Sequence, residues 1–152
     1  MNKDLVGVLP ALATPLNSDG SFDEAGMRRL VRFTLDNGMK TLFVLGYAGE
    51  VLTFDRSTRR RIIETVRDEA GPNIPLIAGV CDNSLELISN HIKDACDCGA
   101  NYVLTTPVDF YYYRDDEIET LFTSLAHISK VPIIIYNCPE VKYKLSAQLL
   151  AK

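Results

Sequence analysis

The chain repeats one pattern, in which a short apolar run rich in β-branched residues is followed by a longer amphipathic segment. The steps from Thr41 to Leu76, Tyr102 and then Ile133 are 35, 26 and 31 residues long, and each is the length of one strand plus one helix. The runs are apolar at nearly every position, as strands covered on both faces are. We predict five strands, at about residues 7–13, 41–45, 76–80, 102–105 and 133–136. Strict alternation of strands and helices predicts an α/β fold with a parallel sheet.

The segments between these strands carry start and stop signals of helices. Residues 21–24 read Ser-Phe-Asp-Glu, the sequence of a capping box, and Gly38 suits the end of the helix that follows. Four more helices are predicted, from about Ser57 to Ala70, from Asn83 or Ser84 to Gly99, from near Asp115 and from Ser146.

Two layouts of such a sheet compete: an open doubly wound sheet and part of a (β/α)8 barrel. The first strand-to-helix connection contains neither GxGxxG nor GxxxxGK[ST], which disfavours the nucleotide-binding forms of the open sheet. A whole barrel takes about 250 residues, whereas the 152 residues here hold five predicted strands. The barrel alternative is therefore a single incomplete barrel domain, residues 1–152, of about five βα units.

Composition excludes several classes of function. Sixteen basic and twenty acidic residues give a net charge of −4, and no basic patch indicates nucleic-acid binding. Four cysteines lack the spacing of zinc motifs and only two histidines are present, so we predict no metal and no cofactor. We interpret the cysteines as reduced thiols of a cytoplasmic protein.

The apolar N-terminal segment Leu5–Ala13 has two interpretations. Its length suits the core of a signal peptide, but Asp4 precedes it and Pro10 interrupts it. A buried first strand is the better prediction. No apolar run approaches the roughly 20 residues of a membrane-spanning helix.

Functional residues of parallel α/β folds gather where strands end at their carboxyl side. Gly46 and Gly49 follow the second predicted strand, and they permit a tight turn whose backbone N–H groups can face a bound carboxylate. Tyr136 ends the fifth predicted strand. Its phenol is either a core group with a satisfied hydroxyl or a positioned proton donor and acceptor.

Five segments, taken in order, resemble the N-terminal half of the dihydrodipicolinate synthase and N-acetylneuraminate lyase family. They read GVLPALATPLNSDGSFD, LFVLGYAGE, PLIAGV, GANYVLTTP and PIIIYNCP, and the resemblance covers essentially the whole chain. It implies a (β/α)8 TIM barrel that works as a class I aldolase, in which a lysine forms a Schiff base with pyruvate or another 2-keto acid. It also implies that Tyr136 is the catalytic proton shuttle and that Gly46, Tyr47, Ala48 and Gly49, next to the matching Glu50, bind the substrate.

The resemblance further implies a homo-oligomer, because a tyrosine of the loop after the fourth predicted strand reaches the neighbouring subunit's site in this family. Tyr111 and Tyr112 are the candidates here. The alternative is that this aromatic loop simply packs against a partner.

The lysine of the family ends the sixth strand of the barrel, whereas this chain ends sixteen residues after Tyr136. Lys152 is at a helical position and does not correspond to that lysine. Lys142 and Lys144 follow the fifth predicted strand, but a solvated loop lysine stays protonated and is a poor nucleophile. We therefore expect the 152 residues alone to be inactive.

Two departures from the family bear on the substrate. Tyr47 and Ala48 replace residues that usually carry hydroxyl groups for the proton relay and the substrate carboxylate. Residues 140–142, Glu-Val-Lys, lack the arginine that the synthases tend to have after this strand. The missing arginine favours a lyase of 2-keto acids, such as a keto-deoxy sugar acid, over dihydrodipicolinate synthase itself, which stays an alternative.

Two further hypotheses remain. A non-catalytic half-barrel would associate through its exposed strand edges, either with the missing C-terminal half or with a second copy. An open-sheet binding domain unrelated to aldolases would require the order of the five segments to be a coincidence.

Overall fold

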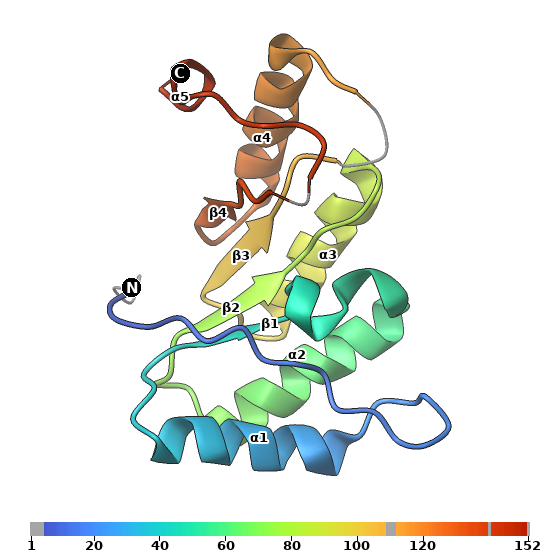
Figure 1. Cartoon of the computed structure of the whole chain (residues 1–152), viewed down its shortest axis with the longest axis vertical. Helices are drawn as coiled ribbons and strands as arrows, with labels where there is room; N and C mark the ends of the chain where they lie inside the picture. Colours follow the sequence, from blue (N-terminus) through green and yellow to red (C-terminus); the bar gives the residue numbers. More distant parts are fainter. Residues whose placement is uncertain (1–4, 109–111, 140, 152) are drawn as a thin grey trace.

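The computed structural model describes residues 5–108, 112–139 and 141–151 (Figure 1). In chain order the elements are α1 (Glu24–Asp36), β1 (Leu42–Val44), the short 3-10 helices η1 (Tyr47–Gly49) and η2 (Val51–Thr53), α2 (Arg56–Ala70), β2 (Leu76–Gly79), α3 (Leu85–Asp97), β3 (Tyr102–Thr105), α4 (Asp115–Ile128), β4 (Ile133–Ile135) and α5 (Ala147–Leu150).

The four strands form one parallel sheet in the order β1-β2-β3-β4. Each strand pairs with the next one along the chain, and each crossover contains a helix. Because such crossovers are right-handed, successive helices fall on the same face of the sheet. In agreement, α1 packs on α2, α2 on α3, and α3 on α4 (Figure 1). The predicted α/β architecture with a parallel sheet is confirmed.

The first predicted strand, residues 7–13, is reduced to a single parallel bridge between Ala11 and Phe43. The Leu12 N–H donates to the Phe43 carbonyl at 2.8 Å, and the Phe43 N–H donates to the Pro10 carbonyl at 3.2 Å. Pro10 has no N–H to extend this ladder, and Val8 is 66% exposed. The prediction of a buried strand therefore holds near Leu12, which is buried, and is wrong for the residues before Pro10.

The helix starts agree with the predictions within a few residues, with one correction at α1. Asp23, not Ser21, caps this helix, because the Ser21 hydroxyl donates to the Asp19 carboxylate instead. Aspartate and serine are equally good capping residues, so α1 still begins near the predicted position, with Asp23 as its cap. Ser84 and Ser146 cap α3 and α5 as predicted.

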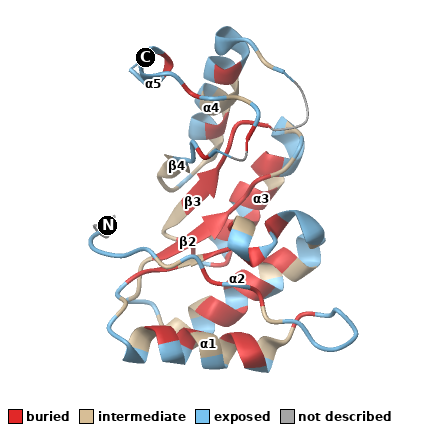
Figure 2. Cartoon of the chain, viewed as in Figure 1, coloured by how far each residue is buried: buried red, intermediate tan, exposed pale blue. Residues whose placement is uncertain are grey.

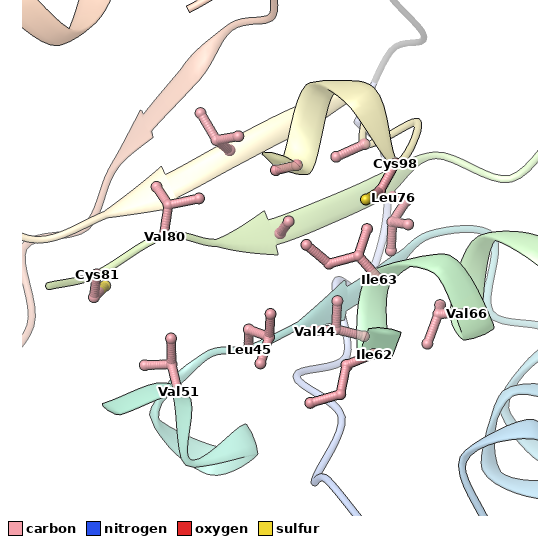
Figure 3. Packing of buried hydrophobic residues seen from close by; sticks show 14 of the residues in the cluster. Val44, Leu45, Val51, Ile62, Ile63, Val66, Leu76, Val80, Cys81 and Cys98 are labelled. Carbon is pink, nitrogen blue, oxygen red and sulfur yellow. The ribbon is translucent and has the colours of Figure 1, made fainter. Parts of the chain in front are cut away.

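The core lies where α1, α2 and α3 pack on the sheet (Figure 3). Its members in that view are Val44, Leu45, Val51, Ile62, Ile63, Val66, Leu76, Val80, Cys81 and Cys98. Burial falls off along the sheet (Figure 2): β2 is buried at all four residues, whereas no residue of β4 is fully buried. The sheet therefore has a well-covered centre and a partly exposed edge at β4.

Candidate active site at the carboxyl ends of the strands

The turn after β1 is built from η1 and η2 and is packed too closely for side chains at its glycines. A Cβ atom on Gly46 would lie 2.7 Å from the Phe43 ring, and one on Gly49 would lie 2.9 Å from the Leu12 carbonyl oxygen. The Thr14 hydroxyl donates to the Gly49 carbonyl at 2.7 Å. The backbone contact makes glycine necessary at position 49, whereas at position 46 the Phe43 ring would have to move; the turn is held against the segment that precedes it.

The backbone N–H groups of this turn are partly used inside it. The Gly49 and Val51 N–H groups donate to the Gly46 carbonyl at 3.0 and 3.3 Å, and the Glu50 N–H donates to the Tyr47 carbonyl at 3.0 Å. These three donors are therefore not available to a ligand. A carboxylate bound here has to be held by other groups of the turn.

Two residues with side chains flank η1 in the left-handed region of backbone space. Leu45 has φ 56° and Glu50 has φ 54°, a conformation that costs an L-residue about 1–2 kcal/mol. Next to Leu45, the neighbouring strand approaches so closely that a Cβ on Gly79 would lie 1.7 Å from the Leu45 carbonyl oxygen. Strained residues of this kind concentrate at functional sites.

The structure brings Tyr136 and Tyr47 together. Tyr136 follows β4, and its N–H donates to the Thr105 carbonyl at 2.9 Å, which fixes its backbone at the end of β3. The centroids of the Tyr47 and Tyr136 rings are 6.3 Å apart with an interplanar angle of 51°, the spacing of a tilted aromatic pair. Tyr136 is 39% exposed, so its ring is accessible and not part of the core. Ala48 is exposed beside the pair.

The loop after Tyr136 is closed by its own polar groups. The side chain of Asn137 both donates to the Leu145 carbonyl and accepts from the Leu145 N–H, each at 3.2 Å. The Lys144 ammonium donates to the Cys138 and Pro139 carbonyls at 2.7 and 2.6 Å. The Lys144 side chain therefore stabilises this loop, whereas a nucleophilic amine has to be held toward its substrate.

Lys142, the other lysine of this loop, lies near an aromatic side chain of the loop between β3 and α4. The Lys142 ammonium is 5.9 Å from the centroid of the Tyr112 ring, within the range of a cation–π interaction. Tyr112 is 86% exposed. Tyr111, the other predicted contact to a neighbouring subunit, lies outside the described residues.

The sequence predictions missed a buried polar cluster at the end of β2. Arg59 of α2 is 6% exposed and lies 3.3 Å from the Asp82 carboxylate, which also lies 3.0 Å from His91 of α3. One signal in the sequence was available: Arg59 is three and four residues before Ile62 and Ile63, so it lies on the inward face of α2.

The described parts of the chain also bear on metal binding and on membrane insertion. No cluster of three or more histidine, cysteine, aspartate or glutamate side chains there could hold a metal ion. Nor does any helix of the described residues combine the length and the apolar character needed to cross a bilayer.

The model of the dihydrodipicolinate synthetase family matches residues 4–149, almost the whole chain. The chain belongs to this family. The resemblance found in the five sequence segments is thereby confirmed.

Two relatives show how far the family likeness extends. The chain is 36% identical over 135 residues to the 4-hydroxy-tetrahydrodipicolinate synthase of Salinibacter ruber, a match over 88% of this chain and 44% of the relative. It is 31% identical, with a TM-score of 0.87, to a crystal structure of a dihydrodipicolinate synthase family protein from Coccidioides immitis, over 93% of this chain and 46% of the other.

A third comparison concerns the fold alone. The protein CdNal of Clostridium difficile, solved in complex with mannosamine, is 24% identical with a TM-score of 0.93, over 98% of this chain and 52% of that one. Because the family structures are TIM barrels, the four-stranded sheet is an incomplete TIM barrel, as predicted. The chain spans about half the length of the proteins that it matches.

Proposed function

We propose that these 152 residues are the part of a Schiff-base-forming class I aldolase or lyase that carries the catalytic phenol. The parent enzyme acts on pyruvate or another 2-keto acid, and Tyr136 shuttles the proton as the carbon–carbon bond forms or breaks. The observation that carries this proposal is the pairing of the Tyr136 and Tyr47 rings, 6.3 Å apart, at the carboxyl ends of two strands. An accessible phenol at this edge suits general acid–base catalysis.

The substrate binds, in this proposal, against the Gly46–Gly49 turn. Ala48 offers no side-chain hydroxyl, and three N–H groups of the turn are bonded within it. Tyr47 is then the residue of this turn whose side chain can contact the keto acid or its relay proton. The absence of an arginine from residues 140–142 favours a lyase of keto-deoxy sugar acids. The names of relatives such as the Salinibacter ruber synthase favour the second candidate, dihydrodipicolinate synthase itself.

The isolated chain is inactive in this proposal, because imine formation needs a desolvated, unprotonated amine opposite the phenol. The Lys144 nitrogen donates to two backbone carbonyls, so it is engaged within its own loop. Lys142 lies beside the Tyr112 ring on the neighbouring loop. Neither environment supports a nucleophile.

Borohydride trapping with pyruvate, followed by intact mass measurement, tests this directly. We expect the 152-residue chain to remain unmodified. A stoichiometric reduced adduct would contradict the inactivity of the chain, and the variants Lys142→Met and Lys144→Met would then identify the amine.

The activity of the parent enzyme needs a second experiment. The chain is joined after its last residue to the C-terminal half of the Salinibacter ruber synthase, and pyruvate release from 2-keto-3-deoxy sugar acids is compared with pyruvate consumption in synthesis. We expect Tyr136→Phe to lower turnover by about 10²–10⁴-fold, the usual contribution of a positioned proton donor. A chimera that traps pyruvate but turns over equally well with and without the phenol would exclude the proposed role of Tyr136.

A different candidate, a half-barrel that works by association, is favoured by the edge of the sheet at β4. Within the described residues β4 pairs with β3 alone, and Ile135 is 38% exposed. Beside this edge lies an apolar hollow of about 260 Å³, lined by Phe122, Ala126, Val131, Pro132, Ile133 and Ile135. We propose that this surface takes up the rest of the barrel in the parent protein, and that Tyr112 contacts a second subunit.

Sedimentation velocity over a range of concentrations tests the association. We expect the isolated chain to self-associate through the β4 edge and Ile135→Lys to weaken this, because charged residues on an edge strand oppose pairing. Leu87→Lys serves as the matched surface control, because Leu87 lies on α3 and is 44% exposed, similar to Ile135. A chain that stays monomeric at all concentrations would argue against an exposed pairing edge.

A further inference from the structure

The buried cluster of Arg59, Asp82 and His91 joins segments that are distant in sequence. The Arg59 guanidinium donates from Nε to the Phe54 carbonyl and from Nη1 to the Cys81 carbonyl, both at 3.0 Å. Phe54 follows η2, the end of the turn that carries Gly46 and Tyr47, whereas Cys81 follows β2. One side chain of α2 thus ties the end of the candidate substrate turn to the end of the neighbouring strand.

A third nitrogen of the Arg59 guanidinium group and the ring of His91 both contact the same carboxylate oxygen of Asp82. Asp82 Oδ2 lies 3.3 Å from Arg59 Nη2 and 3.0 Å from His91 Nε2. The other oxygen, Oδ1, accepts the Asn83 N–H at 2.7 Å. The carboxylate thus has three partners, and a neutral His91 that carries its proton on Nε2 is one of the donors.

The charges of the cluster balance only while His91 is neutral. One guanidinium faces one carboxylate, and Arg59 and His91 are 6% and 8% exposed. Protonation of His91 adds a second cation that shares a carboxylate oxygen with Arg59, in a site with little water to screen it. In agreement, burial first and the Arg59 charge second lower the pKa of His91, against the opposing effect of Asp82.

The remaining charge near His91 is Asp94, which favours the protonated ring but does not outweigh burial and the Arg59 charge. Asp94 lies on the same helix, α3, but it is already bonded to Arg56 at 2.5 Å and to Arg60 at 3.0 Å from α2. The groups that face His91 are therefore Arg59 from α2, Asp82 from the loop after β2, and an Asp94 whose charge is matched.

We propose that Arg59, Asp82 and His91 form a positioning cluster that fixes the Gly46–Phe54 turn against the carboxyl end of β2, and that it does so only while His91 is neutral. Acidification protonates His91 and weakens the hold of Arg59 on the Phe54 and Cys81 carbonyls. The turn then opens locally while the rest of the sheet stays folded. This inference concerns the conformation of the turn and does not depend on the proposed aldolase activity.

Hydrogen exchange measured by mass spectrometry tests the inference on the chain itself. Exchange of peptides that cover Gly46–Phe54 is compared at pH 7.5 and pH 5.5 after correction for the intrinsic rate, with peptides of α1 as the internal reference. We expect the opening of the turn to increase at pH 5.5 by at most about tenfold, because an unfolded histidine with a pKa near 6.5 is about nine-tenths protonated at that pH. The α1 peptides should not change.

Variants separate this device from general acid sensitivity. His91→Gln keeps a donor toward Asp82 without titrating, so we expect the turn to be closed at both pH values. The matched control His127→Gln, at the other histidine of the chain, should keep the wild-type response. In Arg59→Lys a single nitrogen replaces the three that contact Phe54, Cys81 and Asp82. We expect this variant to open the turn already at pH 7.5.

Nuclear magnetic resonance of the two imidazole rings supplies an independent readout. The His91 signal, assigned by its loss in His91→Gln, should titrate below the ordinary value of 6.5. An unchanged turn at pH 5.5, a pH response kept in His91→Gln, or simultaneous opening of the turn and α1 would each overturn the proposal.

Discussion

Replacing Gly79 with alanine is expected to break the contact between the two first strands of the sheet. The new Cβ would lie 1.7 Å from the Leu45 carbonyl oxygen and 2.5 Å from its carbonyl carbon, where ordinary contact begins at 3.4 Å. Both neighbouring atoms belong to the backbone, so no side-chain rotation relieves the overlap. Strands β1 and β2 would have to separate where Val44 pairs with Ala78.

The expected cost follows from what such a separation disrupts. Two or three backbone hydrogen bonds contribute about 1 kcal/mol each, and overpacking adds about 1–3 kcal/mol. We expect the free energy of unfolding to fall by about 4 kcal/mol. With a urea dependence of about 2 kcal/mol per molar, the midpoint of urea unfolding, followed by circular dichroism, falls by about 2 M.

Gly20→Ala is the control for this experiment. Gly20 has φ 83° and a Cβ there would meet no atom within 4 Å, so this variant carries the backbone strain of about 1–2 kcal/mol without the overlap. A Gly79→Ala protein that is as stable as Gly20→Ala would refute the steric argument.

Two further predictions concern single ionisable groups. Burial, followed by a hydrogen bond to Glu64, raises the pKa of the Cys98 thiol to about 12, so iodoacetamide at pH 8 should label Cys98 at least about tenfold more slowly than the half-buried Cys96; equal labelling in peptide mass spectra would contradict this. Arg56 and then Arg60 lower the pKa of Asp94, so its contribution to stability is present above pH 3.8 and is lost as the pH falls below that value. Asp94→Asn should therefore cost about 1–3 kcal/mol at pH 7 and weaken the acid dependence of urea unfolding, whereas Asp97→Asn, at an exposed position of the same helix, should do neither; equal effects of the two variants would count against a special role of Asp94.

Much of the fold could be predicted because strands covered on both faces and amphipathic helices leave strong patterns in sequence. Residues 102–105 form β3 as predicted, and the other three strands of the sheet are shorter by one or two residues. The first predicted strand shows the limit of the pattern. Its apolar residues begin before Pro10, but backbone pairing with β1 does not extend to them. Pairing depends on N–H groups, which Pro10 lacks, and not on hydrophobicity.

The candidate site was predicted only where its residues end a strand or belong to a family motif. Tyr136 and Tyr47 were proposed in this way, and the structure adds that their ring centroids lie 6.3 Å apart. Arg59 was not found, because its three partners, Phe54, Cys81 and Asp82, come from loops that no local pattern brings together. A charged residue on an apolar helix face indicates such a partner set without naming it.

The sheet order, identical to the chain order, makes this protein behave as a one-dimensional array. Each βα unit interacts mainly with the unit before it and the unit after it, so stability is distributed as a series of interfaces. Fraying is then expected to begin at the terminal unit formed by β4 and α5, which gives up a single strand interface when it detaches. We expect the inner units to keep their packing when that terminal unit detaches.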